Sequence, residues 1–481
     1  MFDSKIYSDR RQKLLAEFSG GLLLFPGNNE SSMNYADNTY PFRQDSTFLY
    51  YFGLNFPELT GVVDVDEGKC FIFGDDLTID DIVWMGAQPT IAQRAQKAGI
   101  THTAPLADLH KYFAKAVTQK RSIHYLPPYR ADTKIQLHGL LAKGLDAITN
   151  SASTELIKAV VRQRNIKASE EILEIEKAAN ITVDMHLKAM RMVRPGITEA
   201  EVAAAVHEQA LAANGDISFP IIATTQGATL HNHYHGNTLK SGELFLLDAG
   251  CETPLGYAAD MSSTIPVDKT FTDRQKDIYN ITLNAHNAAV EALKPGVAFK
   301  EIHLLAAKTI ATGLEEMGLM KGNIDDAVAA GAHALFFPCG LGHLMGLDVH
   351  DMENLGEEYV GYHNEKKSTQ FGLKSLRLGR ILEPGFVLTI EPGIYFIPEL
   401  IDMWRAEGRF TDFVNYERVL EYRDFGGIRN EEDFLITEEG SRLLGKPLPK
   451  SIAEVESIKK EQKTKVLLRL DHNTPAKVPP S

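Results

Sequence analysis

Gly242-Glu-Leu-Phe-Leu-Leu-Asp248 and Gly385-Phe-Val-Leu-Thr-Ile-Glu391 are two segments of this 481-residue chain that share one pattern. In each, a glycine precedes apolar, strand-like residues and an acid stands six positions after the glycine. An acid at the end of an apolar strand needs a partner, because burial of an unpaired carboxylate is costly. Three more candidate ligands are Asp260, His343 and Glu431. Five donors of this kind could hold a pair of divalent metals.

The helical segments that precede these two strands also repeat. Arg194-Pro-Gly-Ile-Thr-Glu199 and Lys294-Pro-Gly-Val-Ala-Phe-Lys-Glu301 each follow one helical stretch and open another. A Pro-Gly pair alone is common punctuation between helices, but together with the strand pattern it indicates two related halves. The Pro-Gly pairs are 100 residues apart and the acids are 143 apart. The second half therefore requires an insertion, for which we expect the polar stretch 351–376.

The N-terminal third of the chain has a different character. Residues 1–155 alternate short apolar, strand-like runs with helical stretches at 90–99 and 133–146, a mixture that predicts an α/β domain. We expect the boundary at Asn150-Ser-Ala-Ser-Thr154. The length of the whole chain is compatible with two or three domains.

A long amphipathic helix is predicted to begin near Ser169 and to end at Arg194-Pro-Gly196. His186 lies on its apolar stripe and is expected to be a core histidine rather than a ligand. From about residue 447 the chain is rich in lysine and proline, and we expect its last ten or so residues to be poorly ordered.

Composition limits the class of protein. Apolar residues make up 44% and charged residues 24%, as in ordinary globular proteins. A net charge of −14 argues against general affinity for nucleic acid or anionic membranes. No apolar run approaches ~18 residues, so no membrane span is expected. The start of the chain lacks a signal-peptide pattern, and three cysteines without a CxxC pair fit a reducing compartment. We therefore expect a cytoplasmic protein.

Asp248 and Asp260 flank Cys251-Glu-Thr-Pro-Leu-Gly-Tyr257, which is typical of a hairpin turn. The predicted strands are residues 244–249 and 257–264, and pairing across such a hairpin can bring two acids onto one face. Facing carboxylates repel each other unless they share a proton or a cation. For this pair alone, a solvated hairpin end is the alternative.

Glu391 and Glu431 lie in two further strand-like segments, 387–396 and 427–436, each with apolar neighbours. Glu432 and Asp433 compete with Glu431 for a role in the site. Alternation along the strand does not choose among these three acids.

Histidines form two groups. His343 and His350 lie in the glycine-rich run 339–351, which does not resemble a helix, and neutral imidazole is a common metal ligand. His231, His233 and His235 are spaced by two, as on one face of a strand. We expect one of these three to face the site rather than all three to bind metal.

Together, these segments resemble a known family. The chain is similar to the pita-bread metallopeptidases, and within them to the Xaa-Pro peptidases, prolidase and aminopeptidase P. The motifs that carry the resemblance are DAG at 248–250, GYAAD at 256–260, GLGH at 340–343, VHD at 349–351, EPGIY at 391–395 and GIRNEED at 427–433. YPFRQDS at 40–46 and YYFG at 50–53 resemble the N-terminal domain of those proteins.

The resemblance implies an α/β N-terminal domain and an α+β pita-bread catalytic domain with two pseudo-twofold halves. The expected domains are residues 1–155, residues 156–450 and a C-terminal tail at 451–481. It also implies two divalent metal ions, for which a carboxylate-rich site favours Mn(II), with Zn or Co as alternatives. The implied ligands are Asp248, Asp260, His343, Glu391 and Glu431; the family's arginine-x-glutamate pattern selects Glu431.

Further active-site residues are implied in the same way. Glu391 would also shuttle a proton to the leaving prolyl nitrogen, and His231 and His350 would hold the substrate or stabilise the tetrahedral intermediate. Arg377, in Ser-Leu-Arg before LEPG, matches the prolidase arginine that binds a free carboxylate. Arg429 matches the arginine that stands two residues before the last glutamate.

The implied reaction is hydrolysis of the bond between an N-terminal residue and proline, with Xaa-Pro dipeptides as the favoured substrates and a homodimer as the assembly. The alternative is aminopeptidase P activity on longer peptides, toward which YPFRQDS leans. A non-catalytic pita-bread binding protein is disfavoured because all five ligands are present. The separate N-terminal domain disfavours methionine aminopeptidase.

The chain departs from the family pattern at three places. The spacing from Asp248 to Asp260 is one residue longer, Cys339 stands where a histidine is expected four residues before His343, and Ser262-Ser-Thr264 replaces a TRT run. These departures concern the positioning of the substrate and not the set of ligands.

Overall fold

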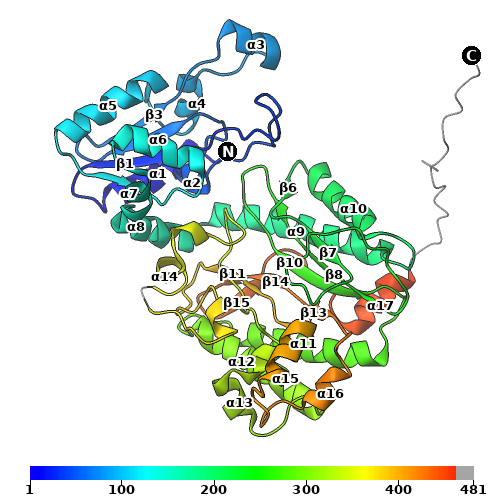
Figure 1. Cartoon of the computed structure of the whole chain (residues 1–481). Coiled ribbons are helices and arrows are strands. Elements are labelled where there is room, and N and C mark those ends of the chain that lie inside the picture. Colours follow the sequence, from blue (N-terminus) through cyan, green and yellow to red (C-terminus); the bar gives the residue numbers. More distant parts are fainter. Residues whose placement is uncertain (364, 462–481) are drawn as a thin grey trace, which may run out of the picture.

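The structure is a computed structural model that describes residues 1–363 and 365–461 (Figure 1). It has an N-terminal α/β unit, drawn in blue and cyan, and a larger unit that runs from green to red. The N-terminal elements are α1 Ser4–Leu15, β1 Leu22–Pro26, α2 Ser46–Phe52, β2 Thr60–Asp64, β3 Lys69–Phe73, α3 Ile79–Met85, α4 Ile91–Lys97, β4 His102–Ala104, α5 Leu106–Thr118, β5 Ile123–Tyr125, α6 Ala131–Leu141 and α7 Leu145–Asn150.

The N-terminal sheet has the strand order β4-β3-β2-β1-β5. Strands β1, β2 and β3 are antiparallel neighbours, and β4 and β5 run parallel to theirs. Leu23 of β1 belongs to the main hydrophobic core, whereas Leu22 and Leu24 pack with Phe113 of α5 and Leu137 of α6. Because successive side chains alternate across a strand, the sheet is apolar on both faces and is covered on both, as the predicted α/β class requires.

The expected helix over 133–146 is two helices. Ala142 has a φ of 52°, in the left-handed region, so α6 ends there and α7 starts at Leu145. The next helix, α8 (Thr154–Asn165), begins at the end of the expected boundary segment and contacts both α1 and α14 (Glu357–Val360).

The larger unit contains the two predicted halves. Its remaining helices are α9 Ser169–Met192, α10 Glu199–Ala212, α11 Asp273–Ala292, α12 Phe299–Glu316, α13 Ile324–Ala330, α15 Pro398–Ala406, α16 Tyr416–Leu420 and α17 Ile452–Lys460. Its strands are β6 Asp216–Ile217, β7 Ile222–Thr224, β8 Leu244–Ala249, β9 Cys251–Glu252, β10 Met261–Pro266, β11 Val387–Ile390, β12 Gly393–Tyr395, β13 Gly427–Arg429, β14 Glu432–Ile436 and β15 Ser441–Leu443.

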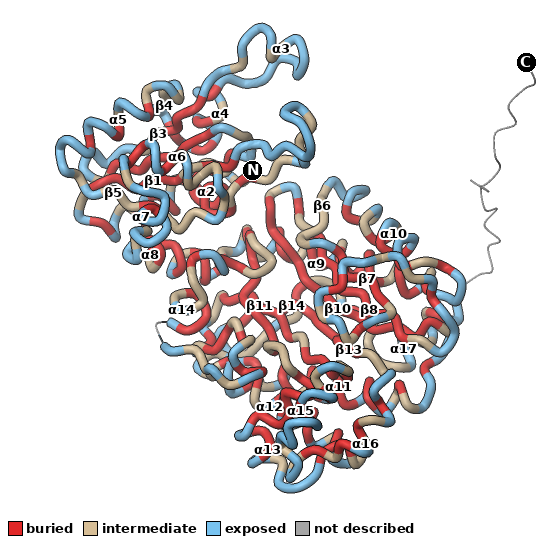
Figure 2. The backbone as a smooth tube through the Cα atoms, viewed as in Figure 1, coloured by how far each residue is buried: buried red, intermediate tan, exposed pale blue. Residues whose placement is uncertain are grey.

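In each half, a pair of helices precedes a three-stranded sheet that carries one of the acidic strands. Helices α9 and α10 lie against the sheet β10-β8-β7, and α11 lies against β11 of the sheet β11-β14-β15. Every strand of these two sheets is buried except β15, an edge strand whose residues are partly buried or exposed (Figure 2). The fold class predicted for this unit is therefore confirmed.

The two Pro-Gly turns are structurally equivalent. Gly196 and Gly296 have φ of 90° and 86°, and their N–H groups donate to the carbonyls of Leu239 and Leu382. Those carbonyls are 143 residues apart, the same offset as the two acids. The insertion in the second half therefore lies between Gly296 and Leu382, a span that includes the expected 351–376.

Two expectations about the chain's course need correction. The second hairpin strand was expected from residue 257, but β10 begins at Met261, and only Ala258 forms an isolated bridge before it. Residues 452–460 were assigned to a tail but form α17, with Val455 buried against the larger unit. The expectation for the last ten residues lies outside the described residues. No described helix is long and apolar enough to span a membrane.

Candidate active site

Strand register brings the four carboxylates together. In the first half Asp248 pairs with Ser262, and Asp260 stands two residues earlier on the same face of the hairpin. In the second half Ile390 pairs with Glu432. The same register carried one step further sets Glu391 opposite Glu431.

The register also resolves the three neighbouring acids at 431–433. Glu432 turns away from the site and pairs with Lys450, at 2.6 Å from Nζ to Oε2. Asp433 accepts a hydrogen bond from the backbone N–H of Asp260 at 3.2 Å and so supports the hairpin. Glu431 is the acid that lines the cavity with the other candidate ligands.

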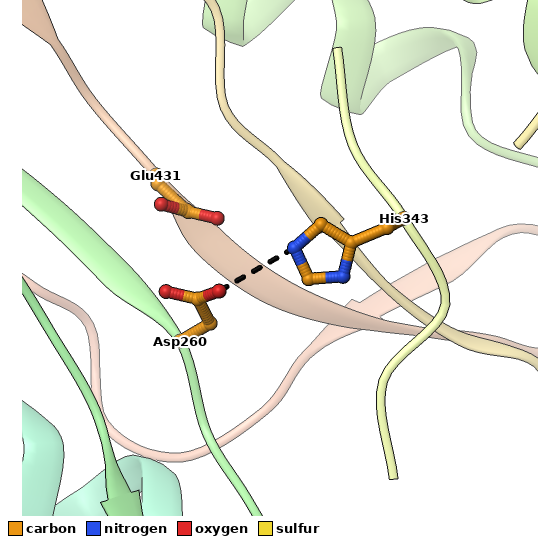
Figure 3. A group of neighbouring side chains, drawn as sticks. All are labelled: Asp260, His343 and Glu431. Atoms are coloured by element: carbon orange, nitrogen blue, oxygen red, sulfur yellow. Dashed lines mark ion pairs between the residues drawn. The ribbon is translucent and has the colours of Figure 1, made fainter. Parts of the chain in front are cut away.

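His343 completes the cluster of acids (Figure 3). Its Nε2 lies 3.4 Å from Asp260 Oδ2 and 3.7 Å from Glu391 Oε1. Its Nδ1 is 3.1 Å from the carbonyl of Leu344, a contact that places the ring proton on Nδ1 and leaves Nε2 as a lone-pair donor. Ligand atoms of Asp260, His343 and Glu431 all lie within 4.8 Å of one another.

Among the described residues, these carboxylates do not have enough hydrogen-bond donors to satisfy all of their oxygens. Asp248 Oδ1, Asp260 Oδ1 and Glu431 Oε1 are buried without a hydrogen bond to any described residue. Burial and the neighbouring Glu431 raise the pKa of Asp260 well above its ordinary value. Burial raises the pKa of Glu391 to about 7, with Asp248 adding to the shift. Buried oxygen and imidazole donors in this state fit a divalent cation, which removes both the repulsion and the unmet lone pairs.

Arg429 is the buried cation that organises this cluster. Its Nη2 donates to Asp248 Oδ2 at 2.5 Å, its Nε donates to Ser262 Oγ at 2.8 Å and its Nη1 donates to the Tyr395 hydroxyl at 3.0 Å. Ser262 in turn donates to Glu431 Oε2 at 2.7 Å. Ser262 and Tyr395 lie in motifs noted in the sequence but were not predicted to belong to the site, although Ser262 shares a strand face with Asp260.

These groups line a cavity of about 220 Å³. All residues predicted for the site reach it: Asp248, Asp260, His343, Glu391, Glu431, His231, His350, Arg377 and Arg429. Cys339 lies in its wall as well. An apolar wall that sequence reasoning missed consists of Phe219, Pro220, Ile222, Leu230 and Val349. The cavity therefore joins a charged centre to a surface on which an apolar side chain can pack.

The histidines at 231–235 do not form a strand, so the expected shared face is wrong. His231 and His233 line the cavity, whereas His235 Nε2 is 3.0 Å from the carbonyl of Ile221. Burial, together with the nearby charge of Arg429, lowers the pKa of His231 and favours its neutral form. His186 is buried between Ser263 and the carbonyl of Ala249, the core position expected for it.

The carboxylate of Glu353 links the remaining two candidates, His350 and Arg377. Glu353 Oε2 lies 2.6 Å from His350 Nδ1, and its Oε1 lies 3.3 Å from Arg377 Nε. The His350 hydrogen bond and the Arg377 charge lower the pKa of Glu353 to about 2. The rings of His343 and His350 are 4.2 Å apart between centroids. His350 thus connects the candidate metal ligands to Arg377.

Comparisons with known proteins agree with this geometry. A family model described as metallopeptidase family M24 matches residues 174–438, and one described as the aminopeptidase P N-terminal domain matches residues 7–124. The Xaa-Pro dipeptidase of Homo sapiens is 30% identical over 458 residues, which cover 93% of this chain and 90% of that protein. A protein of Botryotinia fuckeliana described as a probable Xaa-Pro aminopeptidase is 31% identical, over 91% of this chain and 83% of its own length.

Solved structures extend the comparison to the fold. Aminopeptidase P II from Yersinia pestis matches with a TM-score of 0.80 and 28% identity, over 95% of this chain and 100% of that one. Zinc-substituted aminopeptidase P from Escherichia coli, in complex with product, matches with a TM-score of 0.79 and 27% identity, over 96% and 100% of the two chains.

Proposed function

The chain belongs to metallopeptidase family M24 and is a metal-dependent Xaa-Pro peptidase; within that activity, we propose that it is a dipeptidase. It would hydrolyse the bond between an N-terminal residue and a C-terminal proline. The competing possibility is removal of the first residue from longer peptides with proline second.

One observation carries the preference for dipeptides. Arg377 lines the catalytic cavity, and its Nε is turned toward Glu353. The planar fork of an arginine matches a carboxylate in bidentate geometry. When proline is the second residue, a carboxylate follows it directly only in a dipeptide, so an arginine at this wall selects for that length.

Two divalent ions would be held by Asp248, Asp260, His343, Glu391 and Glu431. Ions of this kind activate water for attack and polarise a carbonyl. The carboxylate-rich donor set with one imidazole favours Mn(II), with Zn or Co as alternatives. The buried oxygens of Asp248, Asp260 and Glu431 that have no hydrogen-bond partner among the described residues support this assignment.

The other side chains have separate roles in this proposal. Glu391 accepts a proton from the attacking water and delivers it to the prolyl nitrogen, which must leave as an amine. His350 and His231 face the same cavity and stabilise charge that develops on the carbonyl oxygen. Arg429 holds Asp248 in place through its buried ion pair.

A peptide-length series tests the proposed substrate. With Mn(II) added, Gly-Pro is expected to be hydrolysed with a higher kcat/KM than Gly-Pro-Gly. Arg377→Ala is expected to raise KM for Gly-Pro by about 10- to 100-fold, the cost of a lost charge-assisted hydrogen bond. If Arg377→Ala leaves turnover of Gly-Pro unchanged, the arginine does not bind the substrate carboxylate.

Aminopeptidase P activity is the second candidate, and two observations favour it. The solved structures described above are aminopeptidase P enzymes. A larger cavity of about 590 Å³ lies between the N-terminal unit and residues 347–355, and it shares Val349 and His350 with the catalytic cavity. That space could receive residues beyond the proline. A higher kcat/KM for Gly-Pro-Gly than for Gly-Pro would establish this alternative.

We further propose a homodimer. Helix α3 has no buried residue, and Val83 and Trp84 on it are 74% and 87% exposed. Exposed apolar side chains gathered on one element are typical of protein–protein contact surfaces. Sedimentation equilibrium gives the mass in solution, and the mass of a monomer would refute this assembly.

A further inference from the structure

Glu353 is not one of the residues to which a role has been assigned above, yet it contacts two that are. One of its oxygens lies 2.6 Å from His350 Nδ1 and the other lies 3.3 Å from Arg377 Nε. Its side chain is 41% exposed, those of His350 and Arg377 are 31% and 35% exposed, and all three border one small cavity. A single carboxylate thus uses both oxygens to join two groups of the substrate cavity.

The backbone that carries Glu353 is fixed from the buried side. Asp351 accepts hydrogen bonds from Arg164 at 2.7 Å and from Lys167 at 2.8 Å, and all three side chains are no more than 3% exposed. This pair of buried cations anchors the loop one residue after His350.

The next residue turns the chain back. Met352 has a φ of 60°, a left-handed conformation that is uncommon for a residue other than glycine. The N–H of Glu353 then donates to the carbonyl of His350 at 3.2 Å and opens the short 3-10 helix Glu353–Leu355. Strain of this kind persists only where the surroundings enforce it. The turn directs the Glu353 carboxylate onto His350 and Arg377.

From this geometry, we propose that Glu353 is a positioning residue: it holds the Arg377 guanidinium against the catalytic cavity and thereby makes a free carboxylate directly after proline a condition of tight binding. This inference rests on the dipeptidase function proposed above and explains how its length selection is built. Glu353 binds through Arg377 Nε, which leaves the two terminal nitrogens of the guanidinium for the substrate.

The location of Glu353 explains why a tether is needed. Arg377 borders the catalytic cavity, whereas Glu353 borders the larger cavity between the two units. A long arginine side chain without a fixed partner samples many rotamers, and ordering it on binding costs free energy. Glu353 orders it before the substrate arrives, so that the carboxylate of a dipeptide meets a preformed site.

Glu353→Gln is the variant that tests this role. The amide keeps the shape of the side chain but carries no charge and has one acceptor oxygen, so it cannot accept hydrogen bonds from both Arg377 Nε and His350 Nδ1. We expect KM for Gly-Pro to rise about tenfold, with KM for Gly-Pro-Gly unchanged. A fall in kcat shared by both peptides is expected from the loss of the His350 hydrogen bond.

Inhibition constants measure how tightly a carboxylate binds and do not depend on turnover of a substrate. L-proline carries the carboxylate and prolinamide does not. In Glu353→Gln, the inhibition constant of L-proline should rise about tenfold, and that of prolinamide should stay the same. In an Arg377→Ala background, Glu353→Gln should produce no further rise in KM for Gly-Pro. Glu358→Gln, an exposed glutamate five residues along the chain, is the matched control and should behave as wild type.

The outcomes separate this inference from the proposed function. If wild type does not prefer Gly-Pro, or if Arg377→Ala has no effect on it, the dipeptidase proposal fails and this inference fails with it. If those two results hold but Glu353→Gln alters Gly-Pro and Gly-Pro-Gly equally, or adds its full effect in the Arg377→Ala background, the inference alone is overturned.

Discussion

At the scale of single residues, the site is defined by buried carboxylates that lack hydrogen-bond partners among the described residues. Asp248, Asp260 and Glu431 each keep a buried oxygen that has no hydrogen bond to a described residue. An unpaired carboxylate of this kind destabilises the folded protein, because its burial removes it from water. All three line one cavity together with His343. This grouping therefore indicates a cation as the missing partner, and substitutions at single residues should reveal it.

Glu431→Gln should abolish most activity while the protein stays folded. The amide removes one negative charge and one ligand oxygen, and changes even outside the ligand set commonly cost 10- to 100-fold in metal affinity or activity. We expect a loss of at least about a hundredfold in kcat/KM. Metal content measured by mass spectrometry should fall in parallel, and the melting temperature of the metal-free proteins should be similar. Full activity of wild type after purification in a chelator would contradict the metal requirement.

Arg429→Lys should weaken the site indirectly. Lysine has one point charge and cannot serve Asp248, Ser262 and Tyr395 at once, as the arginine does. We expect metal affinity to fall by about 10- to 100-fold, with KM for Gly-Pro little changed at saturating metal. Metal titration followed by calorimetry measures the first and steady-state kinetics the second. A large rise in KM at saturating metal would instead show that Arg429 contacts the substrate.

Single residues also mark the limit of sequence reasoning. An acid that ends an apolar strand is recognisable without a structure, because its surroundings in sequence are its surroundings in space. Arg429 and Asp248 are 181 residues apart, and no local pattern reports that they touch. The same holds for Glu353. A left-handed turn at Met352, which the residue type there does not predict, sets it beside His350, and its other partner, Arg377, is 24 residues away in sequence.

At the scale of elements, the hairpin β8–β10 depends on one close backbone approach. A Cβ added to Gly250 would lie 1.8 Å from the carbonyl oxygen of Ala259, a backbone atom that cannot move aside without opening the hairpin. Gly250→Ala should therefore destabilise the protein by at least about 1–3 kcal/mol and reduce metal affinity. Gly144→Ala is the control, because a Cβ there meets nothing within 4 Å. Denaturant unfolding of the two variants compares them, and equal midpoints would refute the steric account.

Element types were predictable where the chemistry is local. The continuous apolar run of β1 and the Pro-Gly turns follow from residue patterns. The extra length of the second half lies in a span, Gly296 to Leu382, that includes the expected 351–376. Other features failed because tertiary contacts decide them. The start of β10 is set by pairing with β8, the left-handed Ala142 divides a continuous helical pattern, and α17 is held by burial of Val455 against the larger unit.

At the scale of the whole molecule, the N-terminal unit forms hydrogen bonds with the loop that precedes His350. Arg43 donates to Glu252 at 2.8 Å, and its Nη2 donates to the carbonyl of Leu347 at 2.8 Å. Ser46 Oγ reaches Asp348 at 2.5 Å. The Arg43 side chain thus links the hairpin that follows Asp248 to the loop that precedes His350. The resemblance of YPFRQDS suggested an N-terminal domain but not this contact, because Glu252 and Leu347 lie more than 200 residues from Arg43 in sequence.

The buried cluster of Asp351 with Arg164 and Lys167 makes this arrangement sensitive to acid. Burial alone would raise the pKa of Asp351, but the charges of Lys167 and Arg164 outweigh it and hold the pKa below the ordinary value. A carboxyl with a lower pKa in the folded state contributes stability that is present above its unfolded pKa, about 3.9, and is lost as pH falls through the folded value.

Asp351→Asn should therefore cost about 3 kcal/mol of unfolding free energy at pH 7, because two buried cations lose a charged partner. The difference from wild type should begin to shrink as pH falls below about 4, where Asp351 of the unfolded wild-type chain takes up a proton, and it should vanish only below the lower folded-state pKa. Urea unfolding of both proteins between pH 7 and pH 3 measures this gap. Because Asp351 anchors the loop that carries His350 and Glu353, kcat/KM at pH 7 should fall as well. A gap in unfolding free energy that stays constant down to pH 3 would show that the ion pairs do not stabilise this interface.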